Sequence, residues 1–262
     1  MTALRNVWAI VEKEWRHYFG SPIAYVAFTV WVFLFGLFFS AALQFFLDAS
    51  MRSQGMEFGG GMKLSMNESL IGPVLRNMAV VVLFVIPFLT MRLIAEEKRQ
   101  GTVELLATAP LTSAEIIGGK FLAALGLFAL MIVAALVNVA LIWLYAPNPP
   151  EWKPVLTGAF CLLLLGGTFI SLGLFISSLT RNQVVAAIVT FGLALALWIV
   201  SWFDEPTAGP LTKALVYTGV LGHVEDMMKG VLDLKHLVYY LSFIGFGLFL
   251  TYESMESQRW RA

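Results

Sequence analysis

The chain has 262 residues, of which 59% are hydrophobic and only 13% are charged, and its formal net charge is zero. Soluble domains contain about 45–50% apolar and about 25% charged residues, so this composition excludes an ordinary soluble fold. The balanced charge also argues against a nucleic-acid partner, because such proteins carry a strongly basic face. We therefore expect a single, all-helical domain that is integral to a membrane.

Residues 1–21 predict an amphipathic helix that lies in the membrane interface. Apolar residues recur at helical spacing there, and Lys13 and Arg16 fall on the opposite side. Trp8, Trp15 and Arg16 would anchor this helix at the level of the lipid headgroups. A cleavable signal peptide is not expected, because the apolar run that follows is too long for one. Ser21 and Pro22 break the helix before that run begins.

Six apolar stretches are long enough to cross a bilayer, whose core of about 30 Å needs about 20 residues of helix. None of them has a charged or histidine side chain near its centre. The lone cysteine, Cys161, is expected to be a small core residue, because one thiol cannot form an internal disulfide or a thiolate cluster. The predicted spans are residues 22–47, 72–94, 116–146, 155–179, 184–203 and 237–252.

The basic residues predict an orientation. Six spans put both ends of the chain on one side, and ten of the 17 Lys and Arg residues fall on that side, close to span ends. Since cytoplasmic loops are enriched in Lys and Arg, we expect both termini in the cytoplasm and the chain in a cell inner membrane. On the outer side, apolar spacing in residues 204–236 predicts one or two short helices, a gate-like segment at the outer leaflet.

The link between the second and third spans is the most informative part of the sequence. Gly101 can end the preceding helix in the left-handed conformation, and Thr102 can then cap a new one. Pro110 stops that helix, and a capping box at residues 112–115 opens the third span. The pattern predicts a short helix over residues 101–109 and favours a docking element for a cytoplasmic partner. An ordinary charged loop that follows the positive-inside rule is the competing interpretation.

The same link resembles a known family. Residues 97–106 (EKRQGTVELL), followed by residues 109–112 (APLT), are similar to the coupling-helix signature of type-2 ABC transporter permeases. Residues 14–25 (EWRHYFGSPIAY) resemble the gliding-motility (Gld) branch of that family, of which the nitrous-oxide-reductase maturation (Nos) permeases are close relatives. The segments 222–226 and 229–234 resemble the outer segment that precedes the last span in the same branch, and residues 180–184 are similar to the family's turn between the fourth and fifth spans.

The resemblance implies a non-catalytic subunit that couples ATP hydrolysis in a separate ATPase subunit to export, or to a mechanical task, across the membrane. ATP and Mg would bind to that partner, and this chain would bind no cofactor and no metal. A second permease subunit, identical or paralogous, and membrane lipids are the other expected partners. The residues implied to contact the ATPase are Glu97, Arg99, Gly101, Thr102, Val103, Glu104, Leu105 and Leu106, with Arg181 and Asn182 as a secondary cytoplasmic contact.

Two other classes of protein compete with this interpretation. An ion-coupled secondary transporter needs ionisable groups near the bilayer midplane, where Gln44 and Asn138 are the main polar residues of this chain. An intramembrane protease of the CAAX type would use paired glutamates such as Glu96 and Glu97, but its motif needs an arginine where this chain has Gly101. The substrate, the choice between homodimer and heterodimer, and the choice between a Gld-like and a Nos-like role stay open.

Two further patterns have a structural interpretation. The run Gly118-Gly119-Lys120 superficially resembles a phosphate-binding loop, but it lacks the upstream glycine and the Ser or Thr that such a loop needs. Close helix packing is the expected reason for these glycines. The three histidines of the chain flank spans on opposite sides of the membrane, so they are not expected to converge on one metal. They are His17, His223 and His236.

Overall fold

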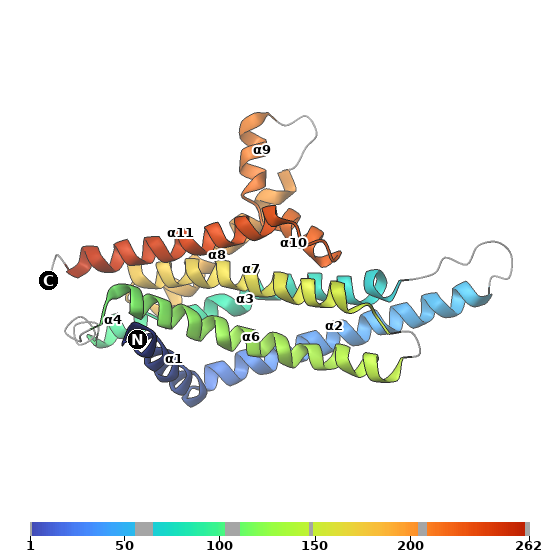
Figure 1. Cartoon of the computed structure of the whole chain (residues 1–262), viewed down its shortest axis with the longest axis horizontal. Coiled ribbons are helices and arrows are strands. Elements are labelled where there is room, and N and C mark those ends of the chain that lie inside the picture. Colours follow the sequence, from blue (N-terminus) through green and yellow to red (C-terminus); the bar gives the residue numbers. More distant parts are fainter. Residues whose placement is uncertain (1, 56–64, 103–110, 147–148, 204–208, 260–262) are drawn as a thin grey trace.

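The computed structural model describes residues 2–55, 65–102, 111–146, 149–203 and 209–259 (Figure 1). Within these ranges every regular element is a helix and none is a strand. Six of the helices are long and apolar enough to cross a membrane, and each of the six predicted apolar stretches falls on one of them. The chain is therefore a multi-pass, all-helical membrane protein, as its composition predicts.

The helices of the described ranges follow one another along the chain with short connections. In chain order they are α1 (Thr2–Gly20), α2 (Pro22–Gly55), the π-helix η1 (Asn67–Ile71), α3 (Gly72–Thr90), α4 (Ala95–Gln100), α6 (Ser113–Tyr145), α7 (Trp152–Leu179), α8 (Gln183–Ile199), the 3-10 helix η2 (Val200–Phe203), α9 (Pro210–Tyr217), α10 (Leu221–Met228) and α11 (Leu234–Arg259).

Several helices are longer than the apolar stretches that predict them. The first span was expected to end at residue 47, but α2 continues to Gly55, and its 34 residues make a rod about 51 Å long at 1.5 Å per residue. Likewise α11 continues from the expected end at residue 252 to Arg259. A helix satisfies its own backbone hydrogen bonds in water as well as in lipid, so a change to polar residues ends the apolar run without ending the helix.

Helix α7 occupies the centre of the bundle, where it packs against α3, α6, α8 and α11 (Figure 1). In the most apolar part of α7, 78% of residues are buried within the protein, and in the span that contains α3 the figure is 72%. The corresponding parts of the other four spans are only 17–33% buried. Helices α3 and α7 therefore form the interior, and the other spans offer their remaining faces to lipid.

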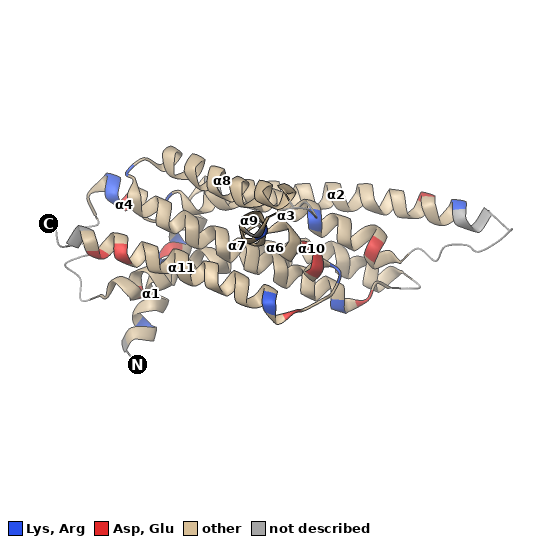
Figure 2. Cartoon of the chain, turned by 90° about the horizontal axis from the view of Figure 1, so that it is seen from above, with Lys and Arg blue, Asp and Glu red and all other residues tan. Residues whose placement is uncertain are grey.

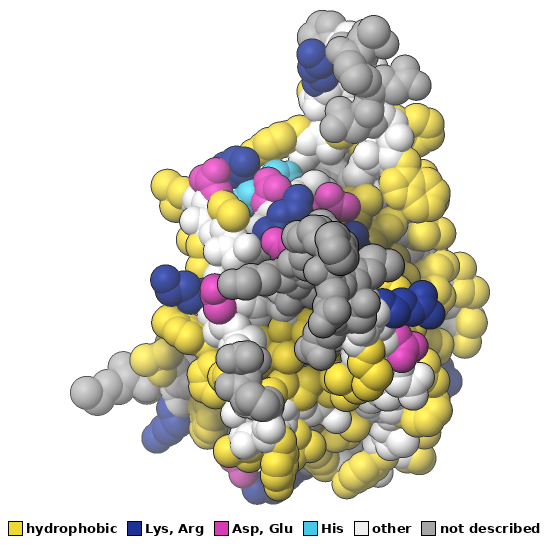
Figure 3. Space-filling model, turned by 90° about the vertical axis from the view of Figure 1, so that its right-hand side faces the viewer, with side chains coloured by type: hydrophobic (Ala, Val, Ile, Leu, Met, Phe, Trp, Pro, Cys, Tyr) yellow, Lys and Arg dark blue, Asp and Glu magenta, His cyan; other side chains and the backbone are white. Residues whose placement is uncertain are grey.

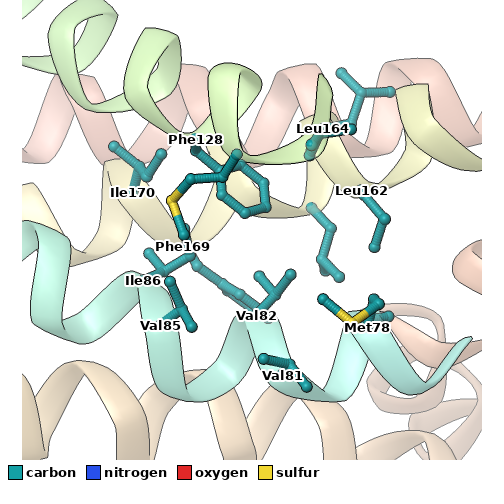
Figure 4. Packing of buried hydrophobic residues seen from close by; sticks show 14 of the residues in the cluster. Met78, Val81, Val82, Val85, Ile86, Phe128, Leu162, Leu164, Phe169 and Ile170 are labelled. Atoms are coloured by element: carbon teal, nitrogen blue, oxygen red, sulfur yellow. The ribbon is translucent and has the colours of Figure 1, made fainter. Parts of the chain in front are cut away.

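The core between these helices is apolar and closely packed, as Figure 4 shows for side chains from α3, α6 and α7. The Phe128 ring of α6 meets the Trp31 ring of α2 edge to face, with 5.3 Å between centroids. The Trp31 indole donates a hydrogen bond of 2.9 Å to the Met131 carbonyl, which satisfies its polar atom inside the core. Gly166 of α7 lies directly against the Phe128 ring, so the helices approach closely at that level.

Charged residues are unevenly distributed along the bundle. Long stretches of α2, α6, α7 and α8 carry none (Figure 2). Both ends of the described chain lie at the same end of the bundle as α4, as an even number of spans requires (Figure 1). The segment expected to hold one or two short helices contains α9 and α10, and α9 projects away from the bundle (Figure 1).

Candidate functional site

The short helix α4 is delimited by features that the sequence predicts. Gly101 adopts the left-handed conformation, with φ of 72°, and this ends α4. The amide of Thr102 then donates a hydrogen bond of 3.0 Å to the Glu97 carbonyl across the turn. A residue with a β-carbon would be strained at this φ, so the glycine fixes where the helix stops and where the chain turns. The capping box of α6 is also confirmed, because Thr112 and Glu115 each accept from the other's backbone amide.

Helix α4 is fastened to the end of α7 by Ser177. The Ser177 hydroxyl oxygen accepts from the amides of Ile94 and Ala95, at 3.1 and 2.9 Å, and donates to the Met91 carbonyl at 3.3 Å. Amides at a helix start have no partner within the helix, so this side chain supplies one from a neighbouring helix. The Lys98 ammonium adds a second link by donating to the Ser178 carbonyl.

Replacing Ser177 with alanine is expected to loosen α4 locally. Two buried amides then lose their acceptor, at a cost of about 1–2 kcal/mol, and amide hydrogen exchange over residues 94–100 should accelerate by about tenfold. Ser40→Ala is the matched control, because that exposed hydroxyl donates only within its own helix, to the Leu37 carbonyl. Equal exchange rates at α4 in both variants would contradict the anchoring role.

A buried lysine on α6 is the centre of this region. The side chain of Lys120 is only 2% exposed, and its ammonium lies 2.8 Å from Glu14 Oε1 and 2.9 Å from Glu97 Oε1. It also donates to the Leu93 carbonyl at 2.6 Å. An ammonium has three donors, and each of these three has an acceptor, so the buried charge is fully satisfied. Lys120 thereby joins α6 to α1, to α4 and to the turn before α4.

A second lysine, Lys13, contacts the same group of buried charges from the protein surface. Lys13 of α1 donates to Glu97 Oε1 at 2.8 Å, so that one carboxylate is shared by two lysines. A cavity of about 390 Å³ adjoins the cluster and is also lined by Arg92 and Glu96. We call the polar contacts of Lys13, Glu14, Glu97, Lys120 and Ser177 the α4 junction.

Further polar contacts extend the α4 junction to the last helix. Ser113 at the start of α6 donates to Glu256 of α11 at 2.7 Å, and the hydroxyls of Ser178 and Ser254 join α7 to α11 at 2.9 Å. Asn6 of α1 reaches the Glu115 carboxylate at 3.1 Å. Polar contacts thus connect five helices, α1, α4, α6, α7 and α11, at one end of the bundle.

The residues predicted to contact the ATPase differ from one another in their exposure and position. Glu97 points into the α4 junction, whereas Arg99 and Gly101 are exposed and Thr102 is partly buried. Val103, Glu104, Leu105 and Leu106 lie outside the described residues, as does the remainder of the helix predicted over 101–109. Arg181 is exposed, and Asn182 caps α8 by accepting from the Val184 amide at 2.9 Å.

Helix α1 forms over the predicted residues and packs along α6. Trp8 is 70% exposed, and Arg16 and Trp15 are also exposed; the interfacial anchoring of these three residues stays a prediction. Trp15 also attaches α1 to α6, because its indole donates to the Ala123 carbonyl at 3.0 Å. Gly119 allows the two helices to approach, since a β-carbon there would lie 2.7 Å from Ile10. Close packing is therefore confirmed for Gly119, whereas Gly118 faces open space.

Sequence reasoning missed the role of Lys120 and Glu14. The sequence marks Lys120 only as one of the basic residues that set the orientation and as part of the Gly118-Gly119-Lys120 run, and Glu14 only as part of the family resemblance. The sequence did contain a sign of this role. Lys120 lies two turns inside an apolar helix, too far from the helix end to be an unpaired cation at the surface. The close approach of His223 and His236, whose Nδ1 atoms are 2.7 Å apart, was also missed.

A comparison with known protein families identifies a matching family. The model described as "ABC-2 family transporter protein" matches residues 8–216, which is more than half of the chain. The matched range begins in α1, includes the α4 junction and ends within α9. Among curated proteins, no significant match was found.

Proposed function

Because the chain belongs to the ABC-2 family of transporter proteins, it is a membrane component of an ABC transporter, and we propose that it is the permease subunit coupled to a separate ATPase subunit. The single observation that favours coupling through this region is the α4 junction. It connects α4, which precedes the segment predicted to dock on the ATPase, with α1, α6 and α7.

The proposed mechanism is mechanical. When the ATPase subunits close on ATP, they displace the segment that follows Gly101, and the left-handed turn at Gly101 delivers that displacement to α4. From α4 it reaches α6 through Glu97 and Lys120, and α7 through Ser177. Interfaces with two packed arrangements convert such small shifts into rearrangements of whole helices. ATP and Mg are held by the partner, and this chain supplies no catalytic group.

The predicted secondary contact supports the same surface. Arg181 and Asn182 lie in the turn between α7 and α8, and α4 packs against both of these helices. The two predicted ATPase contacts are therefore neighbours at one end of the bundle. We propose that this end, which also holds both ends of the described chain, faces the cytoplasm of an inner membrane, with α1 lying along the membrane surface.

The complete transporter is proposed to contain two permease subunits, identical or paralogous. Residues 14–25 and 222–234 favour the Gld or Nos branch of the family. The apolar spans suit a hydrophobic cargo or a mechanical task, since they offer no charged path across the membrane.

Glu104→Arg is expected to weaken binding of the ATPase subunit by about tenfold, equivalent to about 1.4 kcal/mol, because it reverses a charge at the centre of the docking segment. The measurement is the dissociation constant between the purified permease, in lipid nanodiscs, and its ATPase. Glu151→Arg is the matched control, because that exposed residue precedes α7 at the opposite end of the bundle. Unchanged binding by Glu104→Arg, or an equal loss in both variants, would place the contact elsewhere.

A further inference from the structure

Two buried histidines face each other between α10 and the first turn of α11. His223 is 6% exposed and His236 is 2% exposed, and their Nδ1 atoms are 2.7 Å apart. Figure 3, which views the molecule from the right-hand side of Figure 1, shows histidine atoms at the surface bordered by acidic and basic side chains. Two nitrogens at this distance form a hydrogen bond, so one proton must lie between them.

The other nitrogen of each ring faces an acceptor. His223 Nε2 lies 3.2 Å from the Tyr217 carbonyl oxygen, and a carbonyl oxygen can only accept a hydrogen bond. His236 Nε2 is buried and makes no hydrogen bond within the described residues, but it lies 3.3 Å from Asp226 Oδ2, an ion-pair distance at which the carboxylate attracts the ring only when the ring is protonated. Each of these two contacts is attractive only when the ring nitrogen carries a proton.

The three contacts need three protons, but two neutral imidazole rings carry only two. Any neutral assignment leaves a lone pair facing another acceptor, either between the rings, at Tyr217 or at Asp226. Four protons would place two N–H groups against each other. We propose that His223 and His236 form a binding site for one additional proton, which is shared between their Nδ1 atoms.

The surroundings of the pair can balance one positive charge. Tyr239 of α11 stacks on the His223 ring with 3.9 Å between centroids, and Tyr217 of α9 and Tyr240 of α11 approach the same ring edge to face. Cys161 of α7 lies behind Tyr240. The charged groups at the rim are Asp226, Asp233 and Lys235, which together contribute one net negative charge.

The side chain of Asp226 is 46% exposed, so the carboxylate that faces His236 is itself in contact with solvent. Burial lowers the pKa of His223 below its ordinary value of 6.5; the Tyr217 carbonyl and Asp226 oppose this effect, and His236 and Lys235 add to it. We expect the pair to take up its additional proton as the pH falls. At higher pH one of the three contacts is lost, so the joint that holds α9 and α10 to the last span becomes proton-dependent.

The test counts protons by ¹⁵N NMR of the full chain in lipid nanodiscs, with labelled histidine, from about pH 8 to about pH 4.5. The protein has three histidines, and His17, whose side chain is 51% exposed, serves as the internal reference. We expect the His223–His236 pair to take up one proton in total. Uptake of two protons by the pair, or of none, would overturn the proposal.

Two substitutions test whether Asp226 acts on the histidine pair by direct contact or only through the overall charge of the region. Asp226→Asn is expected to lower the midpoint of the pair's titration by about one pH unit, because it removes the carboxylate that faces His236. Asp233→Asn is the control: it removes a carboxylate that lies beside Lys235, and the amide can still cap α11 through the Lys235 amide. Equal shifts in the two variants would exclude a direct contact between Asp226 and the pair.

Discussion

Lys120→Met is expected to lower the free energy of unfolding by about 3–5 kcal/mol, because the buried carboxylates of Glu14 and Glu97 lose the cation they share. The side chains of these glutamates are only 8% and 15% exposed, so water cannot replace the lost partner fully. Equilibrium unfolding in mixed micelles of lipid and detergent measures the difference. A loss below about 1 kcal/mol would mean that Lys120 is not the energetic centre of the α4 junction.

Lys13→Met is the matched control for this substitution. Lys13 contacts the same Glu97 oxygen at 2.8 Å, but its side chain is 57% exposed, and an exposed ion pair contributes about 0–1 kcal/mol. The double variant Lys120→Met with Glu14→Gln should recover part of the stability lost in Lys120→Met, because it removes the carboxylate whose remaining cation, Lys13, is 3.7 Å away, whereas Glu97 keeps Lys13 at 2.8 Å. Recovery would assign the loss to buried charge and not to the packing of the lysine stem.

Gly166→Ala is expected to destabilise the bundle by about 1–3 kcal/mol, because the new methyl group overlaps the buried Phe128 ring. Phe128 can move only by disturbing Trp31, with which it makes an edge-to-face contact. The same unfolding measurement applies. Gly192→Ala on α8 is the control, since a β-carbon there meets nothing within 4 Å, and alanine in a helix is favoured over glycine by about 1 kcal/mol. Effects of the same sign in the two variants would contradict close packing at Gly166.

Local chemistry made much of the fold predictable. The six spans follow from apolar length, the end of α4 from Gly101, and the start of α6 from the reciprocal hydrogen bonds of Thr112 and Glu115. Each of these features depends on residues within a few positions of one another. Helices α2 and α11 continue beyond the predicted spans, because hydropathy reports where lipid contact stops and not where the helix stops.

The α4 junction could not be predicted in the same way. Glu14 and Lys120 are 106 positions apart, and the residues around each of them do not indicate that the two side chains form an ion pair. Their pairing depends on how α1 packs against α6, which involves the bulk of Trp15 and the small size of Gly119. The two histidines are only 13 positions apart, but the chain between them turns at Gly230, with φ of 88°, and that turn brings the rings together.

The central position of α7 has a consequence for how the protein is made. Spans enter a bilayer one after another, and each is stable there alone because its backbone is satisfied internally. α3 is the second span and α7 the fourth, so the nascent chain holds α3 in the bilayer before its main packing partner has been synthesised. Insertion can therefore proceed span by span, whereas assembly of the bundle must wait until α7 has left the ribosome.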